Sequence, residues 1–448
     1  MKWASLIAGL AGMILLIRWL RRNDQAIPWL WTLIGIAPFL ISYFHMYMAI
    51  ISWSEWSGYV KGMEIAGLDL LAIIAFASSK APLRPPPFLL SMLFYIGVIL
   101  LSALQSDLTT PVYFVAWQFF RMMFLALTLV RACADPRVAP ALLTGLAIGI
   151  CFEAGLSVVQ RFGGGALQAA GTFVHQNLLG LISNGLVMPF VAILLVRPSL
   201  VRHWIVPLAG LVVCLMTVSR ATLGMYALGW SLLFLISLIR YWSLQKLWAL
   251  LACLAVVAIA VPMAQSLFVS RFQATPLDAD YDERAAFIKA ATMMLSDHPL
   301  GVGANNYVVV VNTKGYNDKA EVAPVYGSRS ANVHNAYILT AAETGYLGLT
   351  ALVVMLLQPL IVAFRCGWRH RSDFRGDILI GLGVALLITY IHCFFEWVFV
   401  MYEYQYFYAL TVGLIGGLAG QLGYWSPVRL SRTASVLLKP ARLEPSTP

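Results

Sequence analysis

The chain of 448 residues is 60% hydrophobic and only 11% charged, with a formal net charge of +10. A soluble domain carries roughly 25% charged residues, so this composition excludes an ordinary soluble protein and indicates that lipid surrounds most of the surface. The positive charge is concentrated in short loops between apolar runs. This pattern indicates membrane topology and contact with membrane lipid rather than nucleic-acid binding.

Apolar runs recur from end to end of the chain, each of about the 17–25 residues that a helix needs to cross a bilayer. Backbone groups in lipid must be hydrogen-bonded within the segment, so these runs are expected to be helices. The sequence predicts an all-α polytopic integral membrane protein, a single transmembrane domain over residues 1–425 with about 12–13 transmembrane helices. The predicted spans are 3–19, 28–50, 60–79, 88–105, 111–131, 140–160, 176–196, 203–219, 221–240, 247–268, 334–364, 376–400 and 404–424.

Basic residues fill every second connecting loop, and such loops are expected on the cytoplasmic side. Residues 426–448 are predicted to form a cytoplasmic basic tail. The side of the amino terminus stays open, because strict alternation places it outside whereas Lys2 argues against that. The loops with few basic residues, expected to face outward, are 51–59, 106–110, 161–175 and a long periplasmic loop at 269–333.

Lys61 and Arg121 are the first polar candidates, in or near spans that enter from the outward side. A charge at this depth needs a partner, so both are expected to pair with Glu64, Asp69 or a lipid phosphate more readily than with substrate. They remain secondary candidates for the site.

The next outward boundaries carry His175, Asn177 and Arg220. His175 and Asn177 precede an apolar run and could simply cap its helix. Arg220 lies between two closely spaced spans with no acidic neighbour in sequence. It is predicted either to extend its side chain to the membrane surface or to bind an anion.

The long loop contains an amphipathic helix, which is expected at the outer membrane–water boundary. Arg284, in its first turn, lies on the same side as the apolar stripe. It could pair with Asp280 or Glu283, or it could join the helix amino terminus in holding a phosphate, since both favour anions. The stripe consists of Phe287, Ile288, Ala291, Met294 and Leu295.

Two conspicuous segments follow this helix. Pro299 ends it, and His298 beside it is either a turn residue or a secondary site candidate. Further on, His334 lies where the long loop meets an apolar run, a position from which a histidine can exchange protons near neutral pH. Asn335 could orient His334, but it is more readily interpreted as the helix cap.

Several familiar sites are missing from the sequence. It has no P-loop, no GxSxG and no metal-ligand spacing. Its six cysteines show no CxxC pair, so neither a disulfide framework nor a zinc site is indicated. We therefore predict no metal and no cofactor. A histidine with arginines at a lipid boundary suits transfer from a lipid-bound pyrophosphate that is already activated.

The polar motifs form a recognisable combination: Arg220, Arg284, His298-Pro299-Leu300-Gly301-Val302-Gly303, His334-Asn335-Ala336-Tyr337 and Glu343-Thr344-Gly345-Tyr346-Leu347-Gly348. Together they resemble the O-antigen ligase and polymerase superfamily. The resemblance implies a metal-independent membrane glycosyltransferase of the GT-C type, with an undecaprenyl-pyrophosphate-linked glycan as donor and, in the ligases, lipid A–core as acceptor. It implies His334 as the essential histidine, Arg284 and Arg220 as ligands of the donor pyrophosphate, and a site on the periplasmic face of the bacterial inner membrane.

Three alternatives to a ligase remain from the sequence. An O-antigen polymerase or a protein O-oligosaccharyltransferase would use the same donor with another acceptor. A transporter or flippase for the lipid-linked sugar belongs to a different class, but such proteins usually show internal repeats and charges at the membrane midplane. This chain shows no convincing repeat, and its candidate polar groups gather at one face.

Overall fold

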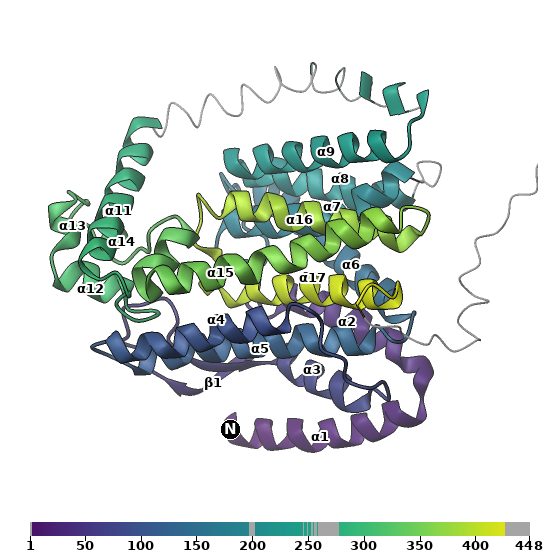
Figure 1. Cartoon of the computed structure of the whole chain (residues 1–448), viewed down its shortest axis with the longest axis horizontal. Coiled ribbons are helices and arrows are strands. Elements are labelled where there is room, and N and C mark those ends of the chain that lie inside the picture. The colour runs from purple at the N-terminus through teal and green to yellow at the C-terminus, as the bar shows by residue number, and fades with distance from the viewer. Residues whose placement is uncertain are drawn as a thin grey trace, which may run out of the picture.

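A computed structural model describes residues 2–196, 202–244 and 277–425, with a few single positions between 246 and 258. Most of the predicted span 247–268 and the whole of the tail 426–448 lie outside the described residues. Figure 1 shows long helices that run side by side, with a cluster of short helices at one end of the bundle. The prediction of an all-α polytopic membrane protein is confirmed.

The helices of the bundle follow the apolar runs of the sequence. Within the described residues, six are long and apolar enough to cross a membrane: α5, α6 with its π-helical extension η3, α7, α9, α15 and α16. The bundle helices are α1 Lys2–Arg22, α2 Ile27–Leu40, α3 Gly67–Ser78, α4 Leu89–Leu101, α5 Thr110–Ala132, α6 Val138–Val158, α7 Gln176–Val196, α8 Arg202–Thr217, α9 Arg220–Arg240, α15 Ala336–Arg369, α16 Phe374–His392 and α17 Tyr402–Gln421. Short turns of helix are η1 Asp24–Ala26, η2 Ser102–Gln105, η3 Val159–Gly163 and η4 Val398–Val400.

A β-hairpin interrupts the region predicted as two continuous helices, 28–50 and 60–79, so that prediction is wrong. Strand β1, Tyr47–Ser52, pairs antiparallel with β2, Gly62–Ala66. The error has a simple cause: hydropathy measures apolar content, and the apolar run at 46–51 contains β-branched residues that suit a strand as well as a helix.

The predicted span 376–400 is also too long. Helix α16 ends at His392, and the following segment folds back across the start of α15 instead of continuing through the membrane. The backbone N–H of Ala336 donates to the carbonyl oxygens of Cys393 and Glu396, at 2.9 and 3.1 Å. This segment is rich in aromatic residues, so its hydropathy stays high. Hydropathy alone therefore does not indicate where the helix ends.

The long loop contains four helices, and three of them, α11, α12 and α13, share a core of their own with the first turns of α15. In Figure 1 they form the green cluster at one end of the bundle. Of the predicted apolar stripe on α11, Ile288 is 38% exposed and the other four residues are buried, so the stripe faces protein. The four helices are α11 Leu277–Asp297, α12 Tyr307–Thr313, α13 Tyr316–Lys319 and α14 Tyr326–Arg329.

Helix α15 is broken at Gly345, where φ is +70° and ψ is −174°. The loop after α11 fills the break with hydrogen bonds. The N–H of Gly303 donates to the carbonyl of Glu343 at 2.8 Å, and the N–H of Tyr346 donates to the carbonyl of Pro299 at 3.2 Å. Backbone groups that the break would leave unpaired are thus satisfied from the loop.

The two segments approach so closely that side chains would collide. A Cβ added at Gly345 would lie 2.5 Å from the carbonyl carbon of Leu300, and one at Gly301, where φ is +86°, would lie 2.4 Å from the carbonyl oxygen of Glu343. Only glycine fits both the left-handed backbone and this spacing. The glycine motifs of the sequence therefore have a structural role, which is to lock the loop against the broken helix.

Candidate functional site

His334 lies just before α15, at the junction of the bundle and the loop helices. Asn335 is the N-cap of α15, as expected, because its side-chain oxygen accepts from the N–H groups of Tyr337 and Ile338, both at 3.0 Å. The cap fixes the direction in which the chain enters the helix. His334 is therefore held at a helix start, with 30% of its side chain exposed.

Two aromatic side chains flank the His334 ring. Phe287 of α11 lies 6.1 Å away between ring centroids, and Trp397 lies 6.4 Å away in an edge-to-face arrangement. One comes from the loop helices and the other from the segment after α16. The imidazole is thus positioned by parts of the chain that are distant in sequence.

Glu396 is the nearest acidic partner of His334, and the sequence analysis missed it. Its Oε2 lies 3.6 Å from Nδ1 of His334, a charge contact longer than a hydrogen bond. Its Oε1 accepts a hydrogen bond of 2.7 Å from the side-chain amide of Asn177. Nδ1 of His334 is buried, so Nε2 is the ring nitrogen left to face a substrate.

The charge state of Glu396 follows from its neighbours. Burial alone would raise the pKa of this carboxyl, but His334, His392 and Asn177 outweigh burial, and the pKa lies below its usual value. The carboxylate therefore stays ionised through neutral and mildly acidic pH, and its charge is lost only as the pH falls through the lowered pKa. A negative charge thus faces Nδ1 of His334 throughout the range in which histidines titrate.

Two further histidines lie near Glu396. Nδ1 of His175 accepts from the backbone N–H of Asn177 at 3.2 Å, so His175 helps to begin α7. Desolvation lowers the pKa of His175, against the attraction of Glu396, and the charge of His334 lowers it further. His392, at the end of α16, is 1% exposed and interacts electrostatically with both Glu396 and Arg284.

Arg284 lies on the site face of α11. It is one helical turn before Phe287, and residues three apart share a helix face. Because Phe287 packs beside His334, this spacing directs Arg284 toward the same region. Its neighbour Glu283 accepts a hydrogen bond from the hydroxyl of Ser328. The structure thus joins Arg284, His334, His392 and Glu396 in one group.

Arg220 is the first residue of α9 and is exposed. Ser219 caps this helix by accepting from the N–H of Thr222. The first turn of α9 packs beside the first half of α7, where the side chain of Asn184 donates to the carbonyl of Thr222 at 2.8 Å. Arg220 therefore lies at the same end of the bundle as Asn177.

The other three candidates have structural partners of their own. Arg121 forms a buried ion pair with Asp69 at 2.8 Å, inside the bundle. Lys61 donates to the carbonyl of Ser54 at 3.3 Å within the hairpin turn. The carbonyl of His298 accepts from the N–H of Gly301 at the end of α11. The structure does not join these three residues to the His334 group.

The β-hairpin reaches the site through its turn. The Tyr59 ring packs edge-to-face on Trp397, with centroids 4.7 Å apart. The side-chain amide of Asn305, in the loop that locks α15, donates to the carbonyl of Val60 at 2.7 Å. The hairpin, the locking loop and the His334 region are therefore connected by direct contacts.

Glu396 and Trp397 could have been found from the sequence, since an acid and a tryptophan together are typical of a membrane boundary and not of its centre. They were overlooked because residues 376–400 were predicted as one span. The hairpin contact through Tyr59 had no local signal. Among the described residues, no group of three or more His, Cys, Asp or Glu has the arrangement of a metal site.

We expect Glu396→Gln to lower the rate of the reaction that depends on His334 by about 10–100-fold. This is the usual effect of losing a group that orients a functional histidine. The pH–rate profile should change as well, because the buried negative charge beside the His334 ring is removed. Glu321→Gln, an exposed position in the loop region, is the matched control. An unchanged rate and profile for the Glu396 variant would contradict the assignment.

Residues 205–353 match the family model described as O-antigen ligase. The match covers less than half of the chain, and it includes Arg220, Arg284 and His334 but ends before Glu396. No curated protein matches the chain. The match confirms the resemblance drawn from the sequence and supports ligase- or polymerase-type function in a multi-pass membrane protein.

Proposed function

From the O-antigen ligase match, we propose that the protein is an inverting, metal-independent glycosyltransferase. It moves O-antigen glycan from undecaprenyl pyrophosphate to a hydroxyl of lipid A–core, at the periplasmic face of the bacterial inner membrane. The observation that carries the proposal is the placement of Nδ1 of His334 against the buried carboxylate of Glu396. This arrangement suits a general base that works through Nε2.

In the proposed reaction, an acceptor hydroxyl attacks the anomeric carbon of the donor glycan. The new C–O bond forms on one face of the sugar while the bond to the pyrophosphate oxygen breaks on the other, which inverts the anomeric centre. Nε2 of His334 takes the hydroxyl proton, and the electron pair of the broken bond leaves with undecaprenyl pyrophosphate. Glu396 offsets the positive charge that develops on the imidazole.

The leaving group gains negative charge as the bond breaks. Arg284, on the site face of α11, and Arg220, at the amino terminus of α9, are the proposed ligands of the pyrophosphate. Guanidinium groups match phosphate oxygens in pairs, and a helix amino terminus adds to the attraction. These cations make the pyrophosphate a better leaving group.

Both proposed substrates are lipid-anchored, which confines them to the plane of the membrane and lowers the entropic barrier to their meeting. His334 lies at the start of a predicted membrane helix, so the reacting hydroxyl is expected at the depth of the helix end. A polymerase that uses a second lipid-linked repeat unit would work with the same donor site and remains the alternative.

The test is transfer by the purified full chain in detergent, with the undecaprenyl-pyrophosphate-linked glycan as donor. We expect glycan on lipid A–core, with inverted anomeric configuration and release of undecaprenyl pyrophosphate. Elongation of a lipid-linked repeat, with lipid A–core left unmodified, would show a polymerase. Because detergent offers no membrane to cross, a lack of any product with either acceptor would favour the transporter alternative.

A further inference from the structure

A second charged cluster lies at the far ends of three helices that also reach the His334 site. Helices α7, α9 and α16 each contain about 20 residues, so their two ends are about 30 Å apart. One set of ends carries Asn177, Arg220 and His392, and the opposite set carries Val196, Arg240 and Asp377. The second cluster is therefore at the other side of the bundle, the side that the basic loops assign to the cytoplasm.

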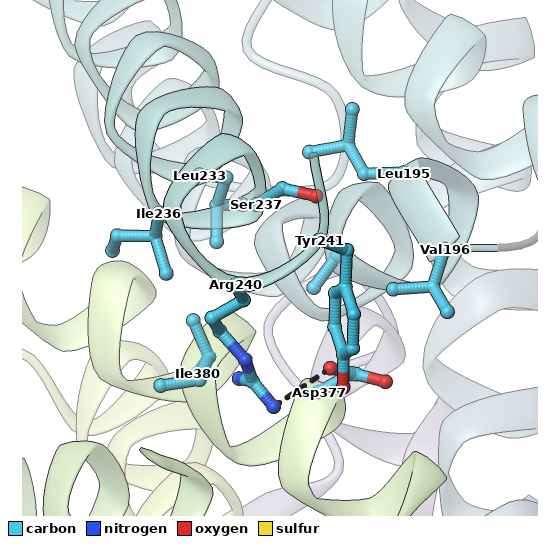
Figure 2. A pocket seen from close by; sticks show the side chains of 10 residues that line it. Leu195, Val196, Leu233, Ile236, Ser237, Arg240, Tyr241, Asp377 and Ile380 are labelled. Carbon is cyan, nitrogen blue, oxygen red and sulfur yellow. Dashed lines mark ion pairs between the residues drawn. The ribbon is translucent and has the colours of Figure 1, made fainter. Parts of the chain in front are cut away.

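A pocket opens between these three helix ends (Figure 2). Aliphatic side chains of all three helices form much of its wall, among them Leu195, Leu233 and Ile380. Arg240 and Asp377 provide charge, and Figure 2 shows the Arg240 side chain extending from α9 toward Asp377. The pocket thus combines an apolar wall with a charged end.

The charges of the cluster do not cancel. Nη2 of Arg240 lies 3.0 Å from Oδ1 of Asp377, and both side chains are buried, with 2% and 7% exposed. Lys246 adds a second cation, whose Nζ donates to the hydroxyl of Ser237 at 2.6 Å. The Tyr241 ring lies between them, 5.4 Å from the guanidinium of Arg240 and 5.5 Å from Nζ of Lys246.

Among the described residues of this cluster, two cations face one carboxylate. One positive charge is left in a largely apolar surrounding, where an unbalanced charge is unfavourable. Nε of Arg240 is buried and finds no hydrogen-bond acceptor within the part of the chain that the structure describes. A planar guanidinium with a free donor suits a phosphate oxygen. Basic pockets between membrane helices on the cytoplasmic side are known sites for anionic lipid head groups.

We propose that this pocket binds the phosphate of an anionic phospholipid, with an acyl chain along the aliphatic wall. The phosphate balances the extra cation of the Arg240, Lys246 and Asp377 cluster. A free phosphate ion offers the same chemistry at the charged end but nothing to the apolar wall. The site is independent of glycan transfer, which is proposed for the opposite end of the bundle.

The test is native mass spectrometry of the delipidated full chain in detergent. The probes are phosphatidylglycerol, phosphatidylethanolamine and inorganic phosphate. We expect one phosphatidylglycerol to be retained in preference to phosphatidylethanolamine. Lys246→Met should weaken its retention about fivefold through loss of the charge, and Val196→Phe should weaken it by filling the pocket. Both substitutions leave the Arg240–Asp377 ion pair in place, so neither strands a buried charge.

Lys80→Met is the matched control, because Lys80 is another basic residue of a predicted cytoplasmic loop but pairs with Asp24 at an exposed position. It should retain phosphatidylglycerol as the unmodified chain does. Equal retention by all the variants would overturn the proposal. Displacement of the lipid by millimolar inorganic phosphate would overturn the lipid as the ligand and assign the pocket to a free anion.

Discussion

Replacement of His334 by alanine is expected to lower the rate of glycan transfer by about 10²–10⁴-fold, the range typical of a lost general base. The histidine lies beside a buried carboxylate at a helix start, so its loss removes the proposed proton acceptor without disturbing the Asn335 cap. Donor binding should be retained. The measurement is the single-turnover rate with saturating donor, together with donor affinity.

A pH series separates this role from a structural one. The residual rate of the His334 variant should lose the pH dependence that a histidine base confers, because the proposed base is gone. His298→Ala is the matched control, since that histidine belongs to the turn after α11 and contributes its backbone carbonyl. Normal transfer by the His334 variant would exclude it as the base.

Replacement of Arg284 by alanine is expected to reduce transfer by about 10²–10³-fold, the usual effect of removing a donor that stabilises developing negative charge. The reason is its place one turn before Phe287, on the face of α11 that packs beside His334. Arg284→Lys should recover part of the rate, because it keeps the charge but not the paired geometry of a guanidinium. The measurement is the rate together with the Kd of the donor pyrophosphate.

Arg329→Ala is the control for this prediction, because Arg329 also belongs to the loop region but pairs with Asp318 at 2.7 Å. Its loss should change transfer little. If Arg284→Ala and Arg329→Ala lower the rate equally, the effect is a general loss of loop structure, and pyrophosphate binding by Arg284 is contradicted.

Much of the bundle could be predicted from hydropathy, because an uninterrupted apolar run of this length must form a helix in lipid. The spans at 111–131 and 176–196 agree within one residue with α5 and α7. The predictions failed at 47–66 and 393–400, where the chain is apolar but does not continue a helix. In those segments tertiary pairing, which hydropathy does not measure, decides the conformation.

The candidate site likewise contains residues that local sequence predicts and contacts that it does not. His334 can be recognised because a loop ends and a helix begins there. Asn335 can be recognised because asparagine is a common N-cap residue and stands directly before that helix. Glu396 has the local signal of a membrane boundary, but its pairing with His334 has none, because it is a contact between segments far apart in sequence. No local pattern in the sequence predicts such a contact. It arises because α16 ends at His392, so that the next segment can pack beside His334.

The locking of the 299–303 loop into the break at Gly345 means that neither segment can be exchanged alone, since each supplies the hydrogen-bond partners that the other lacks. A chimera between related proteins would have to carry both together. The same loop connects the end of α11 to both sides of the break in α15, because Gly303 bonds to Glu343 before Gly345 and Pro299 bonds to Tyr346 after it. The position of Arg284 on α11 is therefore tied to that of His334 at the start of α15, against which α11 packs.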